Sequence, residues 1–134
     1  MCAVALKALW WKGMNEKHND VFCQLEAKLD EIEAELRRIG YWSTVEVDPF
    51  EGVPVEHRCY RKASSFVAWL QFVFLPNARD AVRSQNLPAD SQVGLMALRE
   101  WDYHSHVAEA QDLILLLNEF DRLVIQAART GNST

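Results

Sequence analysis

The chain has 134 residues, a formal net charge of −5 at pH 7 and a hydrophobic share of 49%. This length suits one domain, and this composition is typical of a folded protein rather than a disordered one. The negative charge disfavours direct DNA or RNA binding, because nucleic-acid binders gather enough Lys and Arg to neutralise several phosphates. We therefore expect one globular domain that does not contact nucleic acid directly.

The first residues, MCAVALKALWWKG, are apolar but lack the basic start and the cleavage site of a signal peptide. We expect residues 1–18 to be an N-terminal extension, either a short docked helix or a leader upstream of a domain that starts near Met14. A single domain then covers 19–130, and 131–134 form a disordered tail. The three cysteines cannot all pair and none lies in a Cys-x-x-Cys motif, which favours a reducing, cytoplasmic location.

A first helix is expected over about 20–39. Asn19 or Asp20 can cap its start, and Gly40 can adopt the left-handed conformation that ends it. Glu33 and Arg37 are spaced as an i, i+4 pair, and we expect the charged face of this helix to be solvated. Its apolar residues recur at steps of three and four, typical of a bundle-packing helix: Phe22, Leu25, Leu29, Ile32, Leu36 and Ile39.

A long connection follows over 40–63, with two prolines, two glycines and no sustained helical pattern. Thr44 to Val47 alternate briefly and could form an extended piece. The aromatic residues of this segment predict that it packs onto the domain, ordered but with little regular structure.

The most apolar stretch is SSFVAWLQFVFLP, residues 64–76, which Ser64 or Ser65 can cap as a helix. Apolar side chains cover nearly its whole circumference and leave Gln71 on a narrow polar strip. About ten helical residues reach only about 15 Å, too short to cross a membrane. We expect a core helix or a partly exposed interface helix. It either ends near Leu75 or, as we favour, kinks at Pro76 and resumes through 78–82.

Residues 86–90 indicate a turn, after which Asp90 or Ser91 can cap a third, short helix. A long last helix is predicted to end near Gly131. The apolar positions of these two helices are Val93, Leu95, Met96, Leu98 and Trp101, and then Leu113, Leu117, Phe120, Val124 and Ala127. The sequence thus predicts an all-α fold, a compact bundle of about four helices with a long ordered loop between the first and second main helices.

Candidate chemistry is sparse. Asp102, His104 and His106, with Glu100 nearby, could present metal ligands on one side of an extended strand, but an exposed interhelical segment is the simpler interpretation. His57 and Cys59 have no identifiable orienting partner. Acidic pairs flank Trp101 and Phe120, and we expect both pairs to be solvated. We therefore predict no catalytic residue, no metal and no cofactor, with an enzyme of unrecognised type left open.

Residues 69–76, WLQFVFLP, resemble the signature of the YqcC-like family of small bacterial proteins. The order of Gly40-Tyr41-Trp42, Leu87-Pro88 and Leu117 to Leu123 is also similar, so the resemblance covers roughly 19–125. It implies a compact helical bundle without an established activity. Genes of this family are associated with tRNA pseudouridine synthase genes in some bacterial genomes. The chain departs from the family pattern at Lys62-Ala63-Ser64 and at Asn77, which puts a polar site at those positions in doubt.

Two functions are compatible with these features. The first is a non-enzymatic protein-interaction or accessory module that binds a protein partner or a second copy of itself. The second is a bundle that holds a small apolar or aromatic ligand between Trp69, Phe72, Phe74, Trp101 and Phe120, with Gln71 as its polar contact. The candidate interaction or pocket residues are Trp42, Trp69, Gln71, Phe72, Phe74, Pro76 and Trp101.

Overall fold

The computed structural model describes residues 12–103 and 105–132, and these residues form helices, turns and loops without a strand. The predicted all-α fold is confirmed. The α-helices are α2 (Lys12–Arg38), α3 (Phe66–Trp69), α4 (Leu75–Ser84), α5 (Val93–Leu98) and α6 (Gln111–Asn132). The shorter turns are the 3₁₀ turns η1 (Val55–His57), η2 (Tyr60–Lys62) and η5 (Ala108–Ala110) and the π turns η3 (Leu70–Phe74) and η4 (Arg99–Tyr103).

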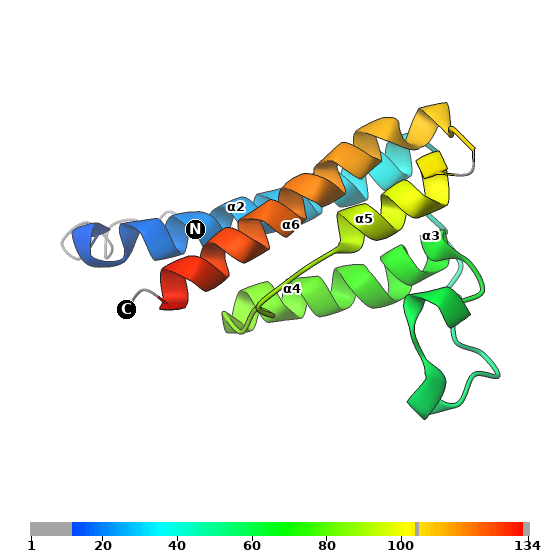
Figure 1. The fold of residues 1–134 in the computed structure, drawn as a ribbon, viewed down its shortest axis with the longest axis horizontal. Helices are drawn as coiled ribbons and strands as arrows, with labels where there is room; N and C mark the ends of the chain where they lie inside the picture. Colours follow the sequence, from blue (N-terminus) through cyan, green and yellow to red (C-terminus); the bar gives the residue numbers. More distant parts are fainter. Residues whose placement is uncertain (1–11, 104, 133–134) are drawn as a thin grey trace.

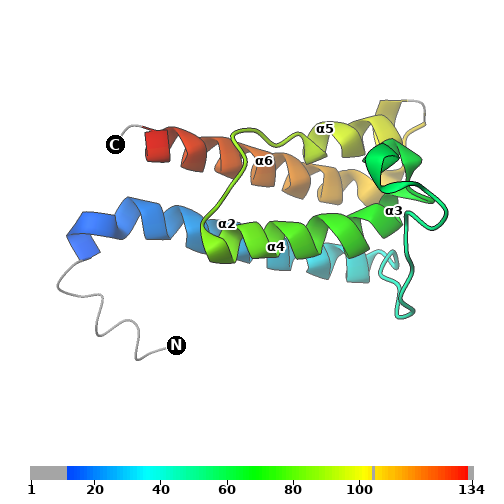
Figure 2. The same ribbon diagram turned by 90° about the horizontal axis from the view of Figure 1, so that it is seen from below.

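Four helices lie side by side: α2 and α5 run in one direction, and α4 and α6 run in the other (Figures 1 and 2). Helix α2 packs against both α6 and α4, and α5 packs against α6. The loop 40–63 and its 3₁₀ turns gather at the end of the bundle where α2 finishes and α3 begins (Figure 2). Helices α4 and α5 lie on the same side of the α2–α6 pair (Figure 1).

The predicted stripes of α2 and α6 form the core. Leu25, Leu29, Ile32 and Leu36 of α2 are fully buried, and so are Leu113 and Leu117 of α6. Gly40 ends α2 with a φ of 80°, and Tyr41 N–H donates to the carbonyl of Leu36. These contacts confirm the core that the spacing predicts.

Helix α2 starts earlier than predicted, whereas α6 ends close to the predicted Gly131. Helix α2 begins at Lys12, so Asp20 lies inside it and the predicted cap at Asn19 or Asp20 is wrong. Residues 12–19, which form the turns before Asp20, are mostly polar. They have no repeating apolar positions, so hydrophobic periodicity could not reveal that they are helical. Helix α6 continues through Gly131 to Asn132. The predictions for residues 1–11 and 133–134 fall outside the described residues.

The apolar stretch is one helical rod from Phe66 to Ser84, capped by the hydroxyl of Ser65, which accepts from Ala68 N–H at 2.9 Å. Its middle turn is a π-helix in which Leu75 N–H donates to the carbonyl of Leu70, five residues earlier. Pro76 has no N–H and crowds the turn before it, and the widened turn relieves this crowding so that the helix continues, as predicted. None of the described helices is long and apolar enough to cross a membrane.

Helix α5 approaches α6 through small residues. Gly94 and Ala97 are buried against α6, whereas Leu95 and Leu98 are each 40% exposed. These two apolar positions of the predicted third helix therefore lie on its outer side. The two helices approach closely at Gly94: a Cβ there would overlap the Asn118 Oδ1 atom and lie 2.8 Å from the Asn118 Cα atom.

Gly94→Ala should therefore lower the free energy of unfolding by about 1–3 kcal/mol, because the added methyl group overlaps Asn118. Urea denaturation followed by circular dichroism measures the change. Adding Asn118→Ala should recover part of the loss, since it removes the two closest atoms but not the backbone. An unchanged unfolding midpoint in the single variant would mean that α5 does not lie this close to α6.

Candidate functional site

The main apolar hollow of the described residues is a groove of about 370 Å³ between α4 and α5. Phe120 and Val124 of α6 are almost fully buried and form its floor. One wall comes from the rod, the other from α5, and the loop that joins α4 to α5 closes one end. The residues that line it are Trp69, Val73, Phe74, Asn77, Ala78, Ala81, Leu87, Pro88, Asp90, Ser91, Gln92, Val93, Met96, Phe120 and Val124.

Three large side chains in the walls of the groove are only half-buried. Trp69, Phe74 and Met96 pack against the core on one side and keep part of their surface in the groove. Of the described residues that line it, Asp90 alone is charged. An apolar hollow with a few polar groups at its edge is the usual character of a binding site in a folded domain.

A buried carboxylate on α6 holds the end of the groove in place. Asp121 is 8% exposed, and its Oδ1 atom accepts from the Ser91 hydroxyl at 2.6 Å and from Val93 N–H at 3.1 Å. Its Oδ2 atom accepts from Gly94 N–H at 2.7 Å. The start of α5 is thus capped from another helix, and the predicted side-chain cap by Asp90 or Ser91 is wrong. The predicted solvation of Asp121 is also wrong.

Burial raises the pKa of Asp121 above its ordinary value of 3.8, and the nearby Asp90 acts in the same direction. The hydrogen bonds from Ser91, Gly94 and Val93 act in the opposite direction, but burial has the larger effect. Both oxygens of this carboxylate are occupied by donors of its own chain, which fits a role in positioning α5 rather than in chemistry.

The polar side chain of the rod, Gln71, contacts the loop and does not line the groove. It is 7% exposed, and its side-chain amide makes two hydrogen bonds to the backbone of Ser43: Oε1 accepts from Ser43 N–H at 2.8 Å, and Nε2 donates to the Ser43 carbonyl at 2.7 Å. The π turn places one more residue in the helical turn than an α-helix would, which changes the direction of the side chains after Leu70. Gln71 thereby attaches the loop 40–63 to the rod.

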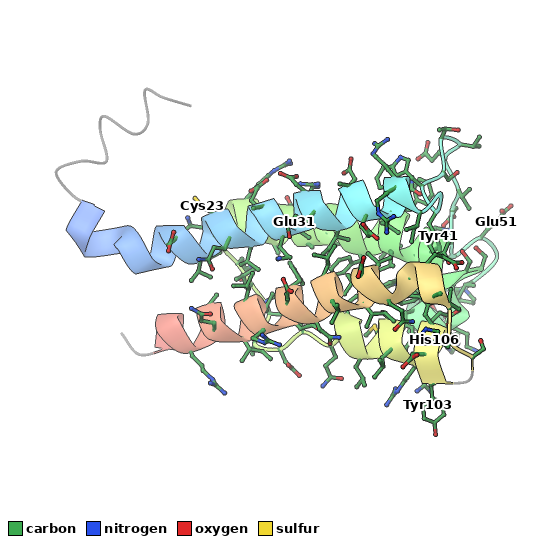
Figure 3. The ribbon with its side chains drawn as sticks, turned by 90° about the horizontal axis from the view of Figure 1, so that it is seen from above. Cys23, Glu31, Tyr41, Glu51, Tyr103 and His106 are labelled. Carbon is green, nitrogen blue, oxygen red and sulfur yellow. The ribbon has the colours of Figure 1, made fainter. Side chains whose placement is uncertain are left out.

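Aromatic rings connect the loop end of the bundle to the groove. Tyr41, which Figure 3 labels at that end, lies 5.9 Å from Trp101 between ring centroids. Phe66 contacts Trp101 at 5.1 Å and Trp69 at 5.8 Å. From Trp69 the contacts continue to Phe74 at 5.9 Å and from Phe74 to Phe120 at 5.4 Å. Offset and edge-on pairs of this kind stabilise a core beyond their buried area.

The structure brings together only part of the predicted pocket. Trp69, Phe74 and Phe120 line the groove, but Trp101 is buried among Tyr41 and Phe66, and Gln71 faces Ser43. Phe72 lines a second, wider hollow of about 760 Å³ beside the loop residues Glu46 to Phe50. The other two candidates lie elsewhere: Arg37 covers the ring of Trp42 at 4.3 Å, and Pro76 is exposed.

Val73 and Asn77 border both hollows, so the middle of the rod is a ridge with a depression on each side. Sequence reasoning missed Val93 and Met96 as groove residues because their apolar character predicts core. It missed Leu87 to Gln92 because a turn gives no periodicity. Leu87-Pro88 in the family resemblance is the one signal that pointed to this loop.

Arginine side chains lie beyond Trp69 at the other end of the groove. The ring of Tyr60 is 6.1 Å from that of Trp69. Hydrogen bonds from Arg61, and to a smaller extent from Arg99, lower the pKa of the Tyr60 phenol, against an opposing effect of burial. Both arginines are exposed.

A histidine and a carboxylate are paired outside the groove. His106 Nδ1 lies 2.8 Å from Asp102 Oδ1 on an exposed surface, and residue 104 falls outside the described residues. Within 12–103 and 105–132, no three His, Cys, Asp or Glu side chains form a group that could hold a metal ion.

A family model named DUF446, with the description tRNA pseudouridine synthase C, matches residues 24–123. This stretch covers the rod, all residues that line the groove except Val124, and a little over half of α2 and α6. The match does not carry the name YqcC-like, so that name stays a resemblance. No curated protein and no solved structure matches the chain.

Replacing Gln71 by Leu should lower the free energy of unfolding by about 1–3 kcal/mol, because two backbone groups of Ser43 lose their partners in a half-buried place. Amide hydrogen exchange at Ser43 should accelerate in the same variant. Gln24→Leu, an exposed glutamine on α2, is the matched control and should change neither quantity. Equal behaviour of the two variants would contradict the anchoring role.

Asp121 should show an unusual pH dependence. Its pKa is raised in the folded state, so the folded state binds this proton more readily than the unfolded state does. Its contribution to stability is therefore fully present below the unfolded pKa and is lost as the pH rises through the folded pKa. The stability of the wild type relative to Asp121→Asn should increase as the pH falls from about 7 to about 4. An Asp121 pKa at or below 3.8 in an NMR titration would overturn this prediction.

Proposed function

This chain belongs to the DUF446 family, and from that premise we propose that it is a non-catalytic accessory protein that binds a protein partner through the groove between α4 and α5. The observation that carries this proposal is the half-buried group of large apolar side chains, Trp69, Phe74 and Met96, over a buried floor. Aromatic anchors near the centre of an apolar depression supply much of the binding energy at protein interfaces.

The family description suggests the partner. We propose that the chain binds a tRNA pseudouridine synthase, because the family model carries the name of that enzyme and the resemblance implies neighbouring genes for it. Direct binding of the tRNA is disfavoured by the net charge of −5. Several arginines are also already paired with carboxylates: Arg37 with Glu33, Arg38 with Glu35, and Arg79 with Asp30 and Glu33.

Two features support a non-catalytic role. The buried carboxylate of Asp121 is occupied by three donors of its own chain. A second acid, Asp102, pairs with His106 on an exposed surface outside the groove. A catalytic pair needs a nucleophile or substrate position within hydrogen-bond reach, in a place from which water can be excluded.

Two other occupants of the apolar surface remain as alternatives. A small apolar ligand is favoured by the groove volume of about 370 Å³, which lies within the range of ligand sites. A second copy of the chain is favoured by the exposed leucines Leu95 and Leu98 of α5 and Leu115 of α6. Native mass spectrometry separates them, since a ligand adds a small mass and self-association doubles the mass.

Ala78→Trp tests the proposal, because Ala78 lines the groove and an indole there would fill it. We expect the affinity for the tRNA pseudouridine synthase of the same genome to fall at least about tenfold, equivalent to about 1.4 kcal/mol. Biolayer interferometry with the immobilised synthase measures this change. Ala34→Trp, an exposed position on α2, is the matched control and should bind like the wild type. No binding by the wild type, or equal loss in both variants, would sink the proposal.

A further inference from the structure

The two ends of the groove carry opposite charges. Asp90 lies at the end closed by the loop between α4 and α5. Its carboxylate is held by Ser91 N–H at 2.9 Å and by the Gln92 side-chain amide at 3.1 Å, and the residue is exposed. The loop thus places a fixed, solvent-exposed negative charge at this closed end of the groove.

The opposite end is positive. Arg61 and Arg99 lie near the phenol of Tyr60, whose ring contacts Trp69 at the end of the groove wall. The Arg61 guanidinium lies 5.9 Å from the centre of the Tyr60 ring. Within the described residues no carboxylate forms an ion pair with either arginine, in contrast to Arg37, Arg38 and Arg79. Their charge therefore remains available to a partner.

The length of the groove wall suits a short helix. The wall from Trp69 to Ala81 covers twelve helical steps, which correspond to about 18 Å, or about three turns. A helix of that length has a partial positive charge at its amino-terminal end and a partial negative charge at its carboxyl-terminal end. Such a helix matches the charges of the groove in one direction only.

We propose that the groove receives one amphipathic helix of the partner in a single orientation, with its positive amino-terminal turn at Asp90 and a negative carboxyl-terminal turn at Arg61 and Arg99. The apolar face of this helix lies on Trp69, Phe74 and Met96. This inference rests on the proposed function and adds to it the type of docking element and its direction. Charges at the rim of an interface fix orientation and partner choice more than they raise affinity.

Two synthetic helical peptides of about 16 residues and identical composition test the direction. Both have blocked ends and the same apolar face. One carries Lys residues in its first turn and Glu residues in its last, and the other has these charges exchanged. The exchanged peptide is the better isolated helix, because its charges complement its own dipole. Tighter binding of the first peptide therefore cannot come from greater helicity.

We expect the first peptide to bind at least about tenfold more tightly in fluorescence anisotropy at low salt, with a smaller ratio at high salt. The triple variant Asp90→Lys, Arg61→Glu, Arg99→Glu should reverse the preference. A control variant with exposed charges reversed elsewhere, Asp20→Lys and Arg129→Glu, should keep it. Circular dichroism establishes that each variant is folded.

The possible failures have distinct meanings. Equal affinity for both peptides, with both blocked by Ala78→Trp, would overturn the single orientation and leave the groove as a protein-binding site. A preference that survives the triple variant would also overturn it. Absence of saturable binding by either peptide, or binding that Ala78→Trp does not affect, would overturn this inference and the assigned groove together.

Discussion

The hydrogen bonds of one carboxylate, that of Asp121, fix the position of α5 and of the loop before it. Two backbone amides and a hydroxyl converge on this side chain from a segment about thirty residues away in the chain. Helix α5 has six residues, so it has little propensity to form alone and depends on tertiary contacts. The same side chain that starts the helix therefore also sets one wall and one end of the groove.

The sequence predicted the core well and the surface of the rod poorly. Leu25, Leu29 and Ile32 were found because their spacing matches the helical period, which dense packing requires. The surroundings of Gln71 and the exposure of Leu95 were not predictable, for different reasons. A π turn changes the direction of Gln71, and the small residue Gly94 brings α5 so close to α6 that Leu95 is left outside. Neither effect has a signature in hydrophobic periodicity, because each depends on a neighbour distant in the sequence.

The groove was predictable only in part for a related reason. The aromatic side chains Trp69 and Phe74 indicated that the rod carries a binding or core surface, and both line the groove. Whether an apolar residue is buried or half-buried depends on the distance between α4 and α5, which the loop 85–92 determines. Gln85 begins that loop in the left-handed conformation at the end of α4. Long-range spacing of this kind cannot be derived from composition.

The π turn also sets which residues of the rod face the groove. Because Leu75 bonds to a carbonyl five residues back, this turn holds one residue more than an α-helical turn, and each later residue takes the direction that its predecessor would have in an uninterrupted α-helix. In this arrangement Arg79 faces Asp30 and Ala78 faces the groove. An uninterrupted α-helix over the same residues would turn both side chains by about 100°. The place of the extra residue is therefore as restrictive as the chemistry of its neighbours.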